Sequence, residues 1–394
     1  MKKTIVDYKL TGKRVIIRSD LNVPIENDVI TNDNRIKESI ETIKFAMDAG
    51  AKVIIMSHLG RVKTEEDKSK NNLEIVCSKL VEILKREVKF IPYTRGIEVE
   101  TAIANMKNGE AIMLQNTRYE DIDGKKESSN DESLGKYWAS LGDIFINDAF
   151  GTCHRAHASN VGIATYLPSG VGFLVNKEIK FLYDSISNPK RPFVIILGGA
   201  KVSDKLGVIK NIVTIADYIL IGGGMCFTFL KALGYNVGSS LVDEESIEFC
   251  KNIYEENKDK IILPVDVVTG TSFIPNTTSR LTSISDISQN EIGMDIGIQT
   301  LNNFRKNLLD ANTIIWNGPL GVFEIDKFST GTRKICEILG GVKGKTIIGG
   351  GDTASAVIKF GYKDKVDYIS TGGGASLELL EGKELPGIAI INDK

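Results

Sequence analysis

The sequence predicts an α/β protein of two domains, each built on a doubly wound parallel sheet. With 394 residues, the chain is longer than one hydrophobic core usually supports. Its composition, 42% hydrophobic and 25% charged with 38 glycines and 9 prolines, is typical of a globular α/β protein. In both halves, short runs rich in Val and Ile alternate with longer segments of helical period, which is the pattern of βαβ units.

The first half contains five of the strand-like runs and the second half six. Helical patterns, such as residues 35–49 and 73–86, lie between them. The predicted strands are residues 14–18, 53–57, 88–91, 111–115 and 143–147 in the first half, and 193–197, 218–221, 261–265, 313–316, 346–348 and 368–370 in the second.

A connecting segment joins the two halves. Its apolar residues follow a roughly helical spacing until Asn188-Pro189 ends the pattern, which predicts a helix from about Leu174 to Ser187. The pattern is consistent with a helix that acts as a rigid lever between the domains, and equally with an ordinary helix packed against one of them. We therefore expect four parts, of which the last returns towards the first domain: residues 1–172, 173–188, 189–375 and 376–394.

Charge and cysteine content narrow the function classes. A formal net charge of −2 gives no general electrostatic attraction to nucleic acid, so we expect no nucleic-acid partner. The five cysteines are scattered and show neither a CxxC pair nor metal-ligand spacing, which indicates reduced thiols in the cytoplasm. No export signal is evident, and no apolar stretch approaches the length of a membrane span, so we expect no membrane partner.

Glycine clusters follow four strands of the second half. Ligands of open α/β sheets lie beyond the carboxyl ends of the strands, where glycines allow backbone N–H groups to approach phosphates. One such cluster is commonly only a tight turn, whereas four in one domain favour a nucleotide site. The clusters are VIILGGAK at 194–201, YILIGGGM at 218–225, TIIGGGDT at 346–353 and YISTGGGA at 368–375.

Charged and polar residues accompany these glycines. Lys201 and Lys205 stand at the start of a predicted helix, where they oppose the helix dipole, so neutralisation of phosphate charge explains them better than a structural role. Asp352, after Gly350 and Gly351 and beside Thr353, could hold Mg²⁺ on nucleotide phosphates or could cap a helix; local sequence leaves both open. In IIWNGPLGVFE, Asn317 lies at another strand end, and Glu324 could accept hydrogen bonds from a sugar.

Two common nucleotide motifs are absent. Residues 340–346, GGVKGKT, resemble a phosphate-binding GxxxxGK[ST] loop, but Leu339 stands where glycine is required and Lys345-Thr346 lead into a strand. GxGxxG is missing at the strand–helix joins, which counts against a dinucleotide enzyme.

The first half carries cations and polar groups at its strand ends instead. Arginines converging from separate strands suit a small polyanion, because guanidinium groups bind phosphate and carboxylate in a bidentate manner. Arg35, at the start of a predicted helix, joins them. The strand-end residues are Arg18, Asp20 and Asn22; His58 and Arg61; Arg118; and His154, Arg155 and His157.

Other catalytic classes find little support. His154 and His157 have no third ligand at a spacing suitable for zinc. No GxSxG motif indicates a covalent serine enzyme, so direct transfer between two bound substrates is the simpler interpretation.

Eight segments, in order along essentially the whole chain, together resemble phosphoglycerate kinase. They are RSDLNVP (18–24), SHLGR (57–61), NDAFGTCHRAH (147–157), LGGAKVSDK (197–205), GGGMCFTFLK (222–231), WNGPLGVFE (316–324), GGGDT (349–353) and STGGGASLELLEGKELPG (370–387).

The resemblance implies a hinge-bending, two-lobed kinase with Rossmann-like domains that transfers phosphoryl between 1,3-bisphosphoglycerate and ADP, giving 3-phosphoglycerate and MgATP. It implies a monomer with Mg²⁺ at Asp352. Departures from the family pattern, at Ser19, Cys153, Met294 and Ser376, remove no charged group. The implied phosphoglycerate residues are Asp20, Asn22, Arg35, His58, Arg61, Arg118 and Arg155, and the nucleotide residues are Lys201, Lys205, Gly293, Asn317, Glu324, Gly350, Gly351, Asp352 and Thr353.

From these roles we expect Arg35 and Lys201 to stabilise the transferring group after closure about residues 174–188. Phosphoryl transfer mainly requires positioning and charge neutralisation, so no general base is expected. Two rival functions remain: a dehydrogenase with an atypical dinucleotide site, and a nucleotide-regulated binding protein without catalysis. The second would require the loss of Lys201, Asp352 or Arg35, all of which are present.

Overall fold

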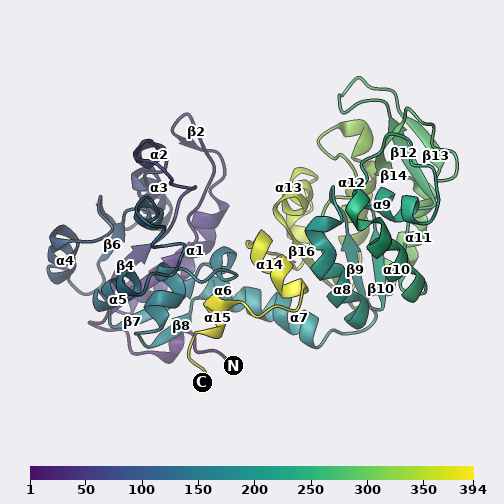
Figure 1. Cartoon of the computed structure of the whole chain (residues 1–394). Coiled ribbons are helices and arrows are strands. Elements are labelled where there is room, and N and C mark those ends of the chain that lie inside the picture. The colour runs from purple at the N-terminus through teal and green to yellow at the C-terminus, as the bar shows by residue number, and fades with distance from the viewer. The chain divides into compact units, whose positions relative to one another are not determined.

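The computed structural model describes residues Met1–Lys394, which form two compact units. Unit 1 comprises Met1–Ile179 and Glu384–Lys394, and unit 2 comprises Lys180–Lys383 (Figure 1). The first division falls inside the predicted connecting segment. Residues 376–383 belong to unit 2, so the return to unit 1 begins at Glu384, later than the predicted residue 376. The four-part division itself stays a prediction.

Unit 1 is built on a six-stranded parallel sheet of order β5-β6-β4-β1-β7-β8. Its central strands are buried runs of branched aliphatic residues, as expected for a sheet covered on both faces. All the strands are parallel, so the carboxyl ends of β6, β4, β1 and β7 lie side by side. The strands are β1 (Arg14–Ser19), β4 (Lys52–Met56), β5 (Lys89–Ile91), β6 (Ala111–Leu114), β7 (Ile144–Asp148) and β8 (Ser169–Val171), with a separate hairpin of β2 (Ile25–Glu26) and β3 (Val29–Ile30).

Helices of unit 1 follow the strands, and their apolar faces join the core. Ile36 and Ile43 of α1 and Leu80 of α3 are fully buried in one cluster with Val15 and Ile17 of β1. The α-helices are α1 (Asn34–Asp48), α2 (Glu65–Lys70), α3 (Glu74–Leu84), α4 (Ile97–Ala104), α5 (Glu132–Ser140), α6 (Phe173–Glu178) and α15 (Pro386–Ala389). Short 3-10 or π segments are η1 (Ile5–Asp7), η2 (Thr117–Asp121), η3 (Phe150–Thr152) and η4 (Ala158–Gly162).

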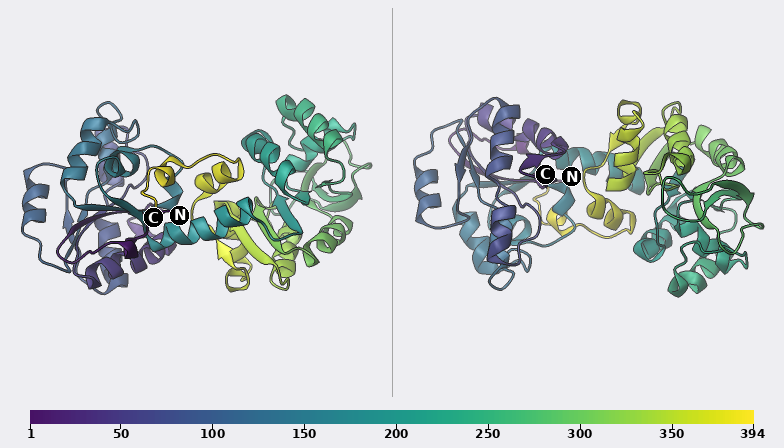
Figure 2. Two further views of the ribbon diagram at one scale, coloured as in Figure 1. Left: turned by 90° about the horizontal axis from the view of Figure 1, so that it is seen from below. Right: turned by 90° about the horizontal axis from the view of Figure 1, so that it is seen from above.

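The two chain termini lie side by side on unit 1 (Figure 2). The Lys2 ammonium donates hydrogen bonds to the carbonyl oxygens of Ala389 and Ile391, at 2.9 and 2.8 Å. The Ser169 backbone N–H donates to Asn392 Oδ1 at 2.8 Å. These bonds tie residues 384–394 to the β8 edge of the sheet.

Unit 2 repeats the architecture with a parallel sheet of order β11-β10-β9-β15-β16-β17. The strands are β9 (Phe193–Leu197), β10 (Tyr218–Ile221), β11 (Ile261–Ile262), β15 (Thr313–Asn317), β16 (Lys345–Gly349) and β17 (Tyr368–Ile369). The helices are η5 (Ile179–Tyr183), α7 (Asp184–Ser187), η6 (Ser203–Lys205), α8 (Leu206–Ile215), α9 (Met225–Ala232), η7 (Glu244–Ser246), α10 (Ile247–Glu256), α11 (Ile298–Leu309), η8 (Asp326–Phe328), α12 (Thr330–Leu339), α13 (Gly351–Lys359), η9 (Lys363–Lys365) and α14 (Gly373–Leu380).

Each predicted strand is present, with boundaries that differ by at most a few residues. The fold predicted from the sequence, two parallel-sheet α/β domains, is confirmed. A three-stranded antiparallel sheet was not predicted; it consists of β12 (Asp266–Gly270), β13 (Arg280–Ser283) and β14 (Ile292–Ile296) in the order β13-β12-β14. Its strand β13, RLTS, is polar and largely exposed, so it lacks the apolar signal of the core strands.

The predicted connecting helix is confirmed as a continuous helical segment. It begins as α6, passes through the π-helical turn η5 and ends as α7 at Ser187. Within unit 2, the Phe181 ring stacks on Tyr368 with 4.5 Å between ring centroids, and the Lys345 ammonium lies 4.5 Å from the Phe181 ring centre. These contacts fix the second part of the segment to unit 2. No helix of the chain combines the length and apolarity needed to cross a membrane.

Candidate functional site

In unit 1, residues after β1 and β4 form one hydrogen-bonded group with α1. Arg35, in the first turn of α1, donates from Nη1 to Asp20 Oδ1 at 3.1 Å and to the Asn22 carbonyl at 3.0 Å. Asn22 Oδ1 accepts from the Gly60 N–H at 2.9 Å, which links the two strand ends. Asp20 is buried, whereas the Arg35 side chain is 35% exposed. Asp20 and Asn22 therefore hold one edge of the guanidinium, and its other donors remain for a ligand.

Arg18, the penultimate residue of β1, connects this group to His58. Its guanidinium is buried and contacts His58 Nδ1 at 3.2 Å through Nη2. The same guanidinium donates from Nε to Ser159 Oγ at 2.9 Å and from Nη1 to the Ser19 carbonyl at 2.6 Å. Arg18 thus lies beneath the predicted site and orients a side chain that belongs to it.

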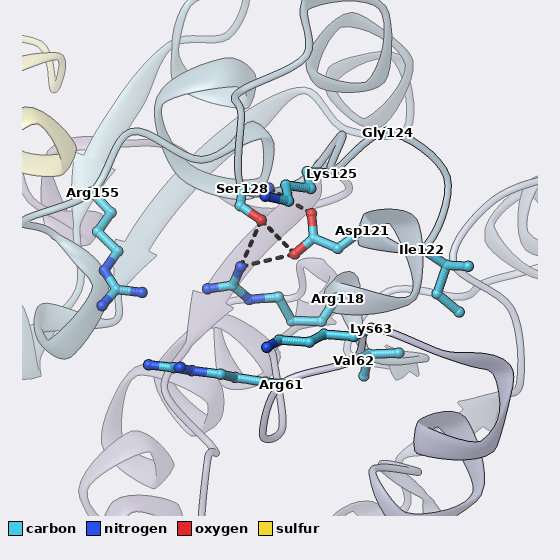
Figure 3. Close-up of a pocket in the computed structure, with 10 residues that line it drawn as sticks. All are labelled: Arg61, Val62, Lys63, Arg118, Asp121, Ile122, Gly124, Lys125, Ser128 and Arg155. Carbon is cyan, nitrogen blue, oxygen red and sulfur yellow. Dashed lines mark hydrogen bonds and ion pairs between the residues drawn. The ribbon is translucent and has the colours of Figure 1, made fainter.

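A cavity of about 770 Å³ brings together three of the predicted arginines. Arg61, Arg118 and Arg155 follow three different strands, and their side chains extend into one shared space (Figure 3). Two hydrogen bonds fix the Arg118 side chain in place, because its Nη1 donates to Asp121 Oδ2 at 2.8 Å and to Ser128 Oγ at 2.9 Å. Two further cations, Lys63 and Lys125, line the same cavity, which is therefore suited to a multiply charged anion.

Sequence reasoning missed four polar residues of this cavity: Lys63, Asp121, Lys125 and Ser128. Asp121 stands three residues after Arg118, a spacing that favours an ion pair and could have identified it. Asp20, Asn22, Arg35 and His58 do not line the cavity; the hydrogen bonds described above connect them to one another or to Arg18.

Burial and positive neighbours keep His58 and His157 neutral. Desolvation, followed by the charges of Arg18, Arg118 and Arg35, lowers the pKa of His58 well below its usual value. Desolvation and Arg118 lower the pKa of His157 to about 3. The chain contains no group of three or more His, Cys, Asp or Glu side chains that could hold a metal ion.

We predict that His157 makes unit 1 sensitive to acid. The unfolded chain binds a proton at this residue below about pH 6.5, whereas the native chain does so only near pH 3, so the free energy of unfolding falls as pH decreases between these values. From pH 7 to pH 5 the loss from this group is about 2 kcal/mol. Urea unfolding, followed by Trp138 fluorescence in a Trp316→Phe background, measures it. His157→Gln should remove this part of the pH dependence; an unchanged dependence would contradict the assignment.

In unit 2, a second cavity of about 220 Å³ lies beyond the strand ends. Glycines after β9 and β10 form one side of it, with Gly199 and Gly223 in left-handed backbone conformations at φ +100° and +64°. These conformations favour glycine, and the two N–H groups donate within the protein, that of Gly199 to the Pro319 carbonyl at 2.9 Å and that of Gly223 to the Leu320 carbonyl at 3.1 Å. The lining consists of Gly199, Ala200, Gly223, Gly224, Leu241, Phe273, Gly293, Met294, Pro319, Gly321, Val322, Glu324 and Asp352.

Three predicted nucleotide residues, Gly293, Glu324 and Asp352, line this cavity. Sequence reasoning missed Leu241 and Phe273, whose side chains are 40% and 60% exposed. Exposed apolar side chains beside a glycine-lined cavity are suited to the flat face of a nucleobase. Neither residue stands at a strand end of the parallel sheet, which is why the strand-end argument did not find them.

Lys205, Asn317 and Thr353 form the support beneath the glycine turns. The Lys205 ammonium is buried and donates to the carbonyl oxygens of Gly198 at 2.5 Å and Asn317 at 3.2 Å; burial lowers its pKa to about 8. Thr353 Oγ1 accepts from the Gly318 N–H at 2.7 Å. The amide Nδ2 of Asn317 is buried without a hydrogen-bond partner. Lys205 therefore joins the ends of β9 and β15, a structural contact that the sequence did not predict.

The structure removes one of the two interpretations of Asp352. The N-cap residue of α13 is Gly350, at φ +88°, and Asp352 lies in the first turn without a capping hydrogen bond. Its carboxylate is exposed and lines the cavity. The helix-cap interpretation is therefore wrong, and the carboxylate is available to a ligand. Lys201, Gly350 and Gly351 are not among the lining residues; Lys201 is exposed.

We predict that Gly293→Ala weakens nucleotide binding. A Cβ at this position would lie 1.7 Å from the Phe227 ring, so β14 or the ring must shift beside the cavity. Overpacking of this kind costs about 1–3 kcal/mol. If this cost reduces the free energy of nucleotide binding, KM for ATP rises by roughly 5- to 150-fold. Gly341→Ala is the control, because the nearest atom to its added Cβ is 3.6 Å away. A folded Gly293→Ala protein with the normal KM for ATP would contradict this role.

Comparisons with known proteins agree on one family. The phosphoglycerate kinase family model matches residues 5–383. Phosphoglycerate kinases of Enterococcus faecalis and Listeria welshimeri are 55% and 54% identical, each over the full length of both chains. The solved phosphoglycerate kinase of Coxiella burnetii has a TM-score of 0.90 at 37% identity, with 99% of this chain and 98% of that chain covered. That of Pyrococcus horikoshii has a TM-score of 0.85 at 29% identity, covering 98% of each. The chain therefore belongs to the phosphoglycerate kinase family.

Proposed function

We propose that unit 1 binds the phosphoglycerate substrate and that unit 2 binds the nucleotide. The chain is a phosphotransferase that moves a phosphoryl group reversibly between 1,3-bisphosphoglycerate and ADP, giving 3-phosphoglycerate and ATP. The observation that carries the assignment of sites is the difference between the two cavities. One is lined by three arginines from separate strand ends together with two lysines, and the other by a group of glycines with two carboxylates, those of Glu324 and Asp352.

The cationic cavity of unit 1 fits a small acid with a phosphate and a carboxyl group. Arg61, Arg118 and Arg155 offer planar groups of donors that suit both anions. Arg118 is held by Asp121 and Ser128 and needs little reordering when a ligand binds. Asp20, Asn22, Arg35 and His58 complete the proposed site through hydrogen bonds to the substrate's oxygen atoms.

The glycine-lined cavity of unit 2 fits a nucleotide with Mg²⁺ on its phosphates. The glycine turns have no side chains and so let phosphate groups approach the backbone closely, and Glu324 suits the ribose hydroxyls. Asp352 would hold Mg²⁺; one carboxylate suffices because this ion is usually bound by one or two carboxylates together with substrate phosphates. When bound, Mg²⁺ neutralises phosphate charge. The proposed nucleotide residues are Lys201, Gly293, Glu324, Gly350, Gly351 and Asp352, with Lys205, Asn317 and Thr353 acting through their support of the glycine turns.

In the proposed mechanism, the protein positions the reactants and neutralises charge. Phosphoryl transfer passes through a loose, in-line transition state with negative charge on the equatorial oxygens. Arg35 and Lys201 supply positive charge to these oxygens. No general base is needed, because the acceptor carboxylate or phosphate is already ionised. The closure expected about residues 174–188 stays a prediction.

An assay of ATP-dependent phosphorylation of 3-phosphoglycerate, coupled to consumption of the acyl phosphate product, tests the function. We expect turnover that requires both substrates and Mg²⁺. Turnover without 3-phosphoglycerate, or none in a folded protein, would contradict the proposal. The dehydrogenase alternative is not supported by the comparisons, and NADH should not bind. The proposal also includes that the protein is a monomer and that it is located in the cytoplasm. The five buried, unpaired cysteines support the proposed location, because thiols stay reduced there.

A further inference from the structure

A buried chain of polar groups leads from the loop at residues 121–131 to His58, all within unit 1. Glu127 is fully buried and accepts from Ser159 twice: from Oγ at 2.5 Å through Oε1, and from the backbone N–H at 2.9 Å through Oε2. Ser159 Oγ accepts in turn from Arg18 Nε at 2.9 Å. Arg18 then contacts His58 Nδ1 at 3.2 Å. Four side chains from four segments of the chain are thereby connected in sequence.

The chemistry of the groups fixes the direction of each hydrogen bond. A guanidinium has only donors, so His58 Nδ1 must be the acceptor. The Ser159 hydroxyl accepts from Arg18 and gives its own proton to Glu127, which as a carboxylate is an acceptor. Nδ1 of a neutral imidazole can accept only when the proton is on Nε2. His58 is therefore held as the Nε2–H tautomer.

The tautomer decides how His58 interacts with an anion. A neutral imidazole with its proton on Nε2 presents a donor there, whereas the other tautomer presents a lone pair that repels an anionic oxygen. His58 is surrounded by the charges of Arg18, Arg118 and Arg35, which together with burial keep it neutral. It cannot attract the substrate by carrying charge, so the position of its single proton matters.

The Arg18 guanidinium needs a partner to stay in this orientation. It is 1% exposed, and a buried charge without a compensating charge is strongly unfavourable. Glu127 supplies the opposite charge at 0% exposure. We propose that Glu127 is a positioning residue, which acts through Ser159 to hold Arg18 in the orientation that makes His58 an Nε2–H donor to the anionic substrate. The inference rests on the proposed place of His58 in the phosphoglycerate site.

Nitrogen NMR of the histidine rings tests the tautomer directly. The chain has three histidines, so a His58→Gln spectrum identifies the His58 signals. We expect a protonated Nε2 and a bare Nδ1 in the unmodified protein, and a mixture of both tautomers in Glu127→Gln and Ser159→Ala. Ser140→Ala is the matched control, because its hydroxyl is exposed and bonds only to the Tyr137 carbonyl. An unchanged tautomer in the folded Ser159→Ala protein would overturn the inference, whether or not Glu127→Gln folds.

Steady-state kinetics supply the second measurement. Glu127→Gln and Ser159→Ala should raise KM for 3-phosphoglycerate about tenfold, the effect of one misdirected hydrogen bond to a charged group, and leave KM for ATP unchanged. A purely structural role would alter both constants. If His58→Gln leaves KM for 3-phosphoglycerate unchanged, the proposed site is wrong at this residue. If His58→Gln raises it but the folded Glu127 and Ser159 variants do not, the positioning inference alone fails.

Discussion

Replacing Arg35 by Met should lower kcat by roughly 10²–10³-fold, corresponding to about 2.7–4 kcal/mol of transition-state stabilisation. Asp20 and the Asn22 carbonyl hold one nitrogen of the guanidinium, which leaves the other donors preorganised for the transferring phosphoryl group. Because Met has a similar length without charge or donors, the loss reports the guanidinium itself. Steady-state rates at saturating ATP and 3-phosphoglycerate provide the measurement.

Two further variants make the Arg35 result interpretable. Arg35→Lys keeps the positive charge but loses the planar set of donors, so it should recover only part of the rate. Arg86→Met removes an arginine that pairs with Asp48 at the surface of the same unit, and it should leave kcat unchanged. Removal of Arg35 also leaves the buried Asp20 without its ion pair, so thermal unfolding must show that the variant is folded. A folded Arg35→Met protein with normal kcat would exclude the proposed role.

Lys201→Met should produce a loss of similar size, about 10²–10³-fold in kcat. Lys201 is exposed just after the β9 glycine turn, and its ammonium is free to follow the nucleotide phosphates. The buried Lys205 cannot replace it, because Gly198 and Asn317 already occupy its ammonium. We therefore assign charge neutralisation during transfer to Lys201 and support of the glycine turns to Lys205.

Substitutions of Lys201 and Lys205 should distinguish the roles of the two lysines by experiment. Lys201→Met should unfold at the temperature of the unmodified protein and lose rate, whereas Lys205→Met should lose stability, because two strand-end carbonyl groups lose their donor. Lys210→Met, on the exposed face of α8, is the control for both. Near-normal kcat in Lys201→Met would show that this ammonium does not stabilise the transferring group.

The sequence predicted the parallel sheets and the strand-end residues because both follow from local patterns. Buried strands such as β1, β4 and β9 are continuous runs of Val and Ile, and parallel pairing places their carboxyl ends side by side. Arginines after three such strands could therefore be assigned to one cavity without knowledge of the loops.

Residues on irregular segments could not be predicted in this way. The loop at residues 121–131 contains three left-handed positions, Gly124, Lys125 and Asn130, two of which are not glycine. Its path is set by tertiary contacts such as those of Glu127, so no periodicity revealed that Glu127 and Ser128 support two arginines. The same holds in unit 2 for Phe273, which follows a strand of the antiparallel sheet that the sequence did not predict.

Hydrogen–deuterium exchange with one substrate at a time tests the central assignment most directly. 3-Phosphoglycerate alone should slow exchange at residues 18–24, 57–63, 116–128 and 150–159 of unit 1. MgADP alone should slow exchange at residues 198–205, 222–226, 317–324 and 349–354 of unit 2. Protection of the unit 2 segments by 3-phosphoglycerate, or of the unit 1 segments by MgADP, would contradict the account.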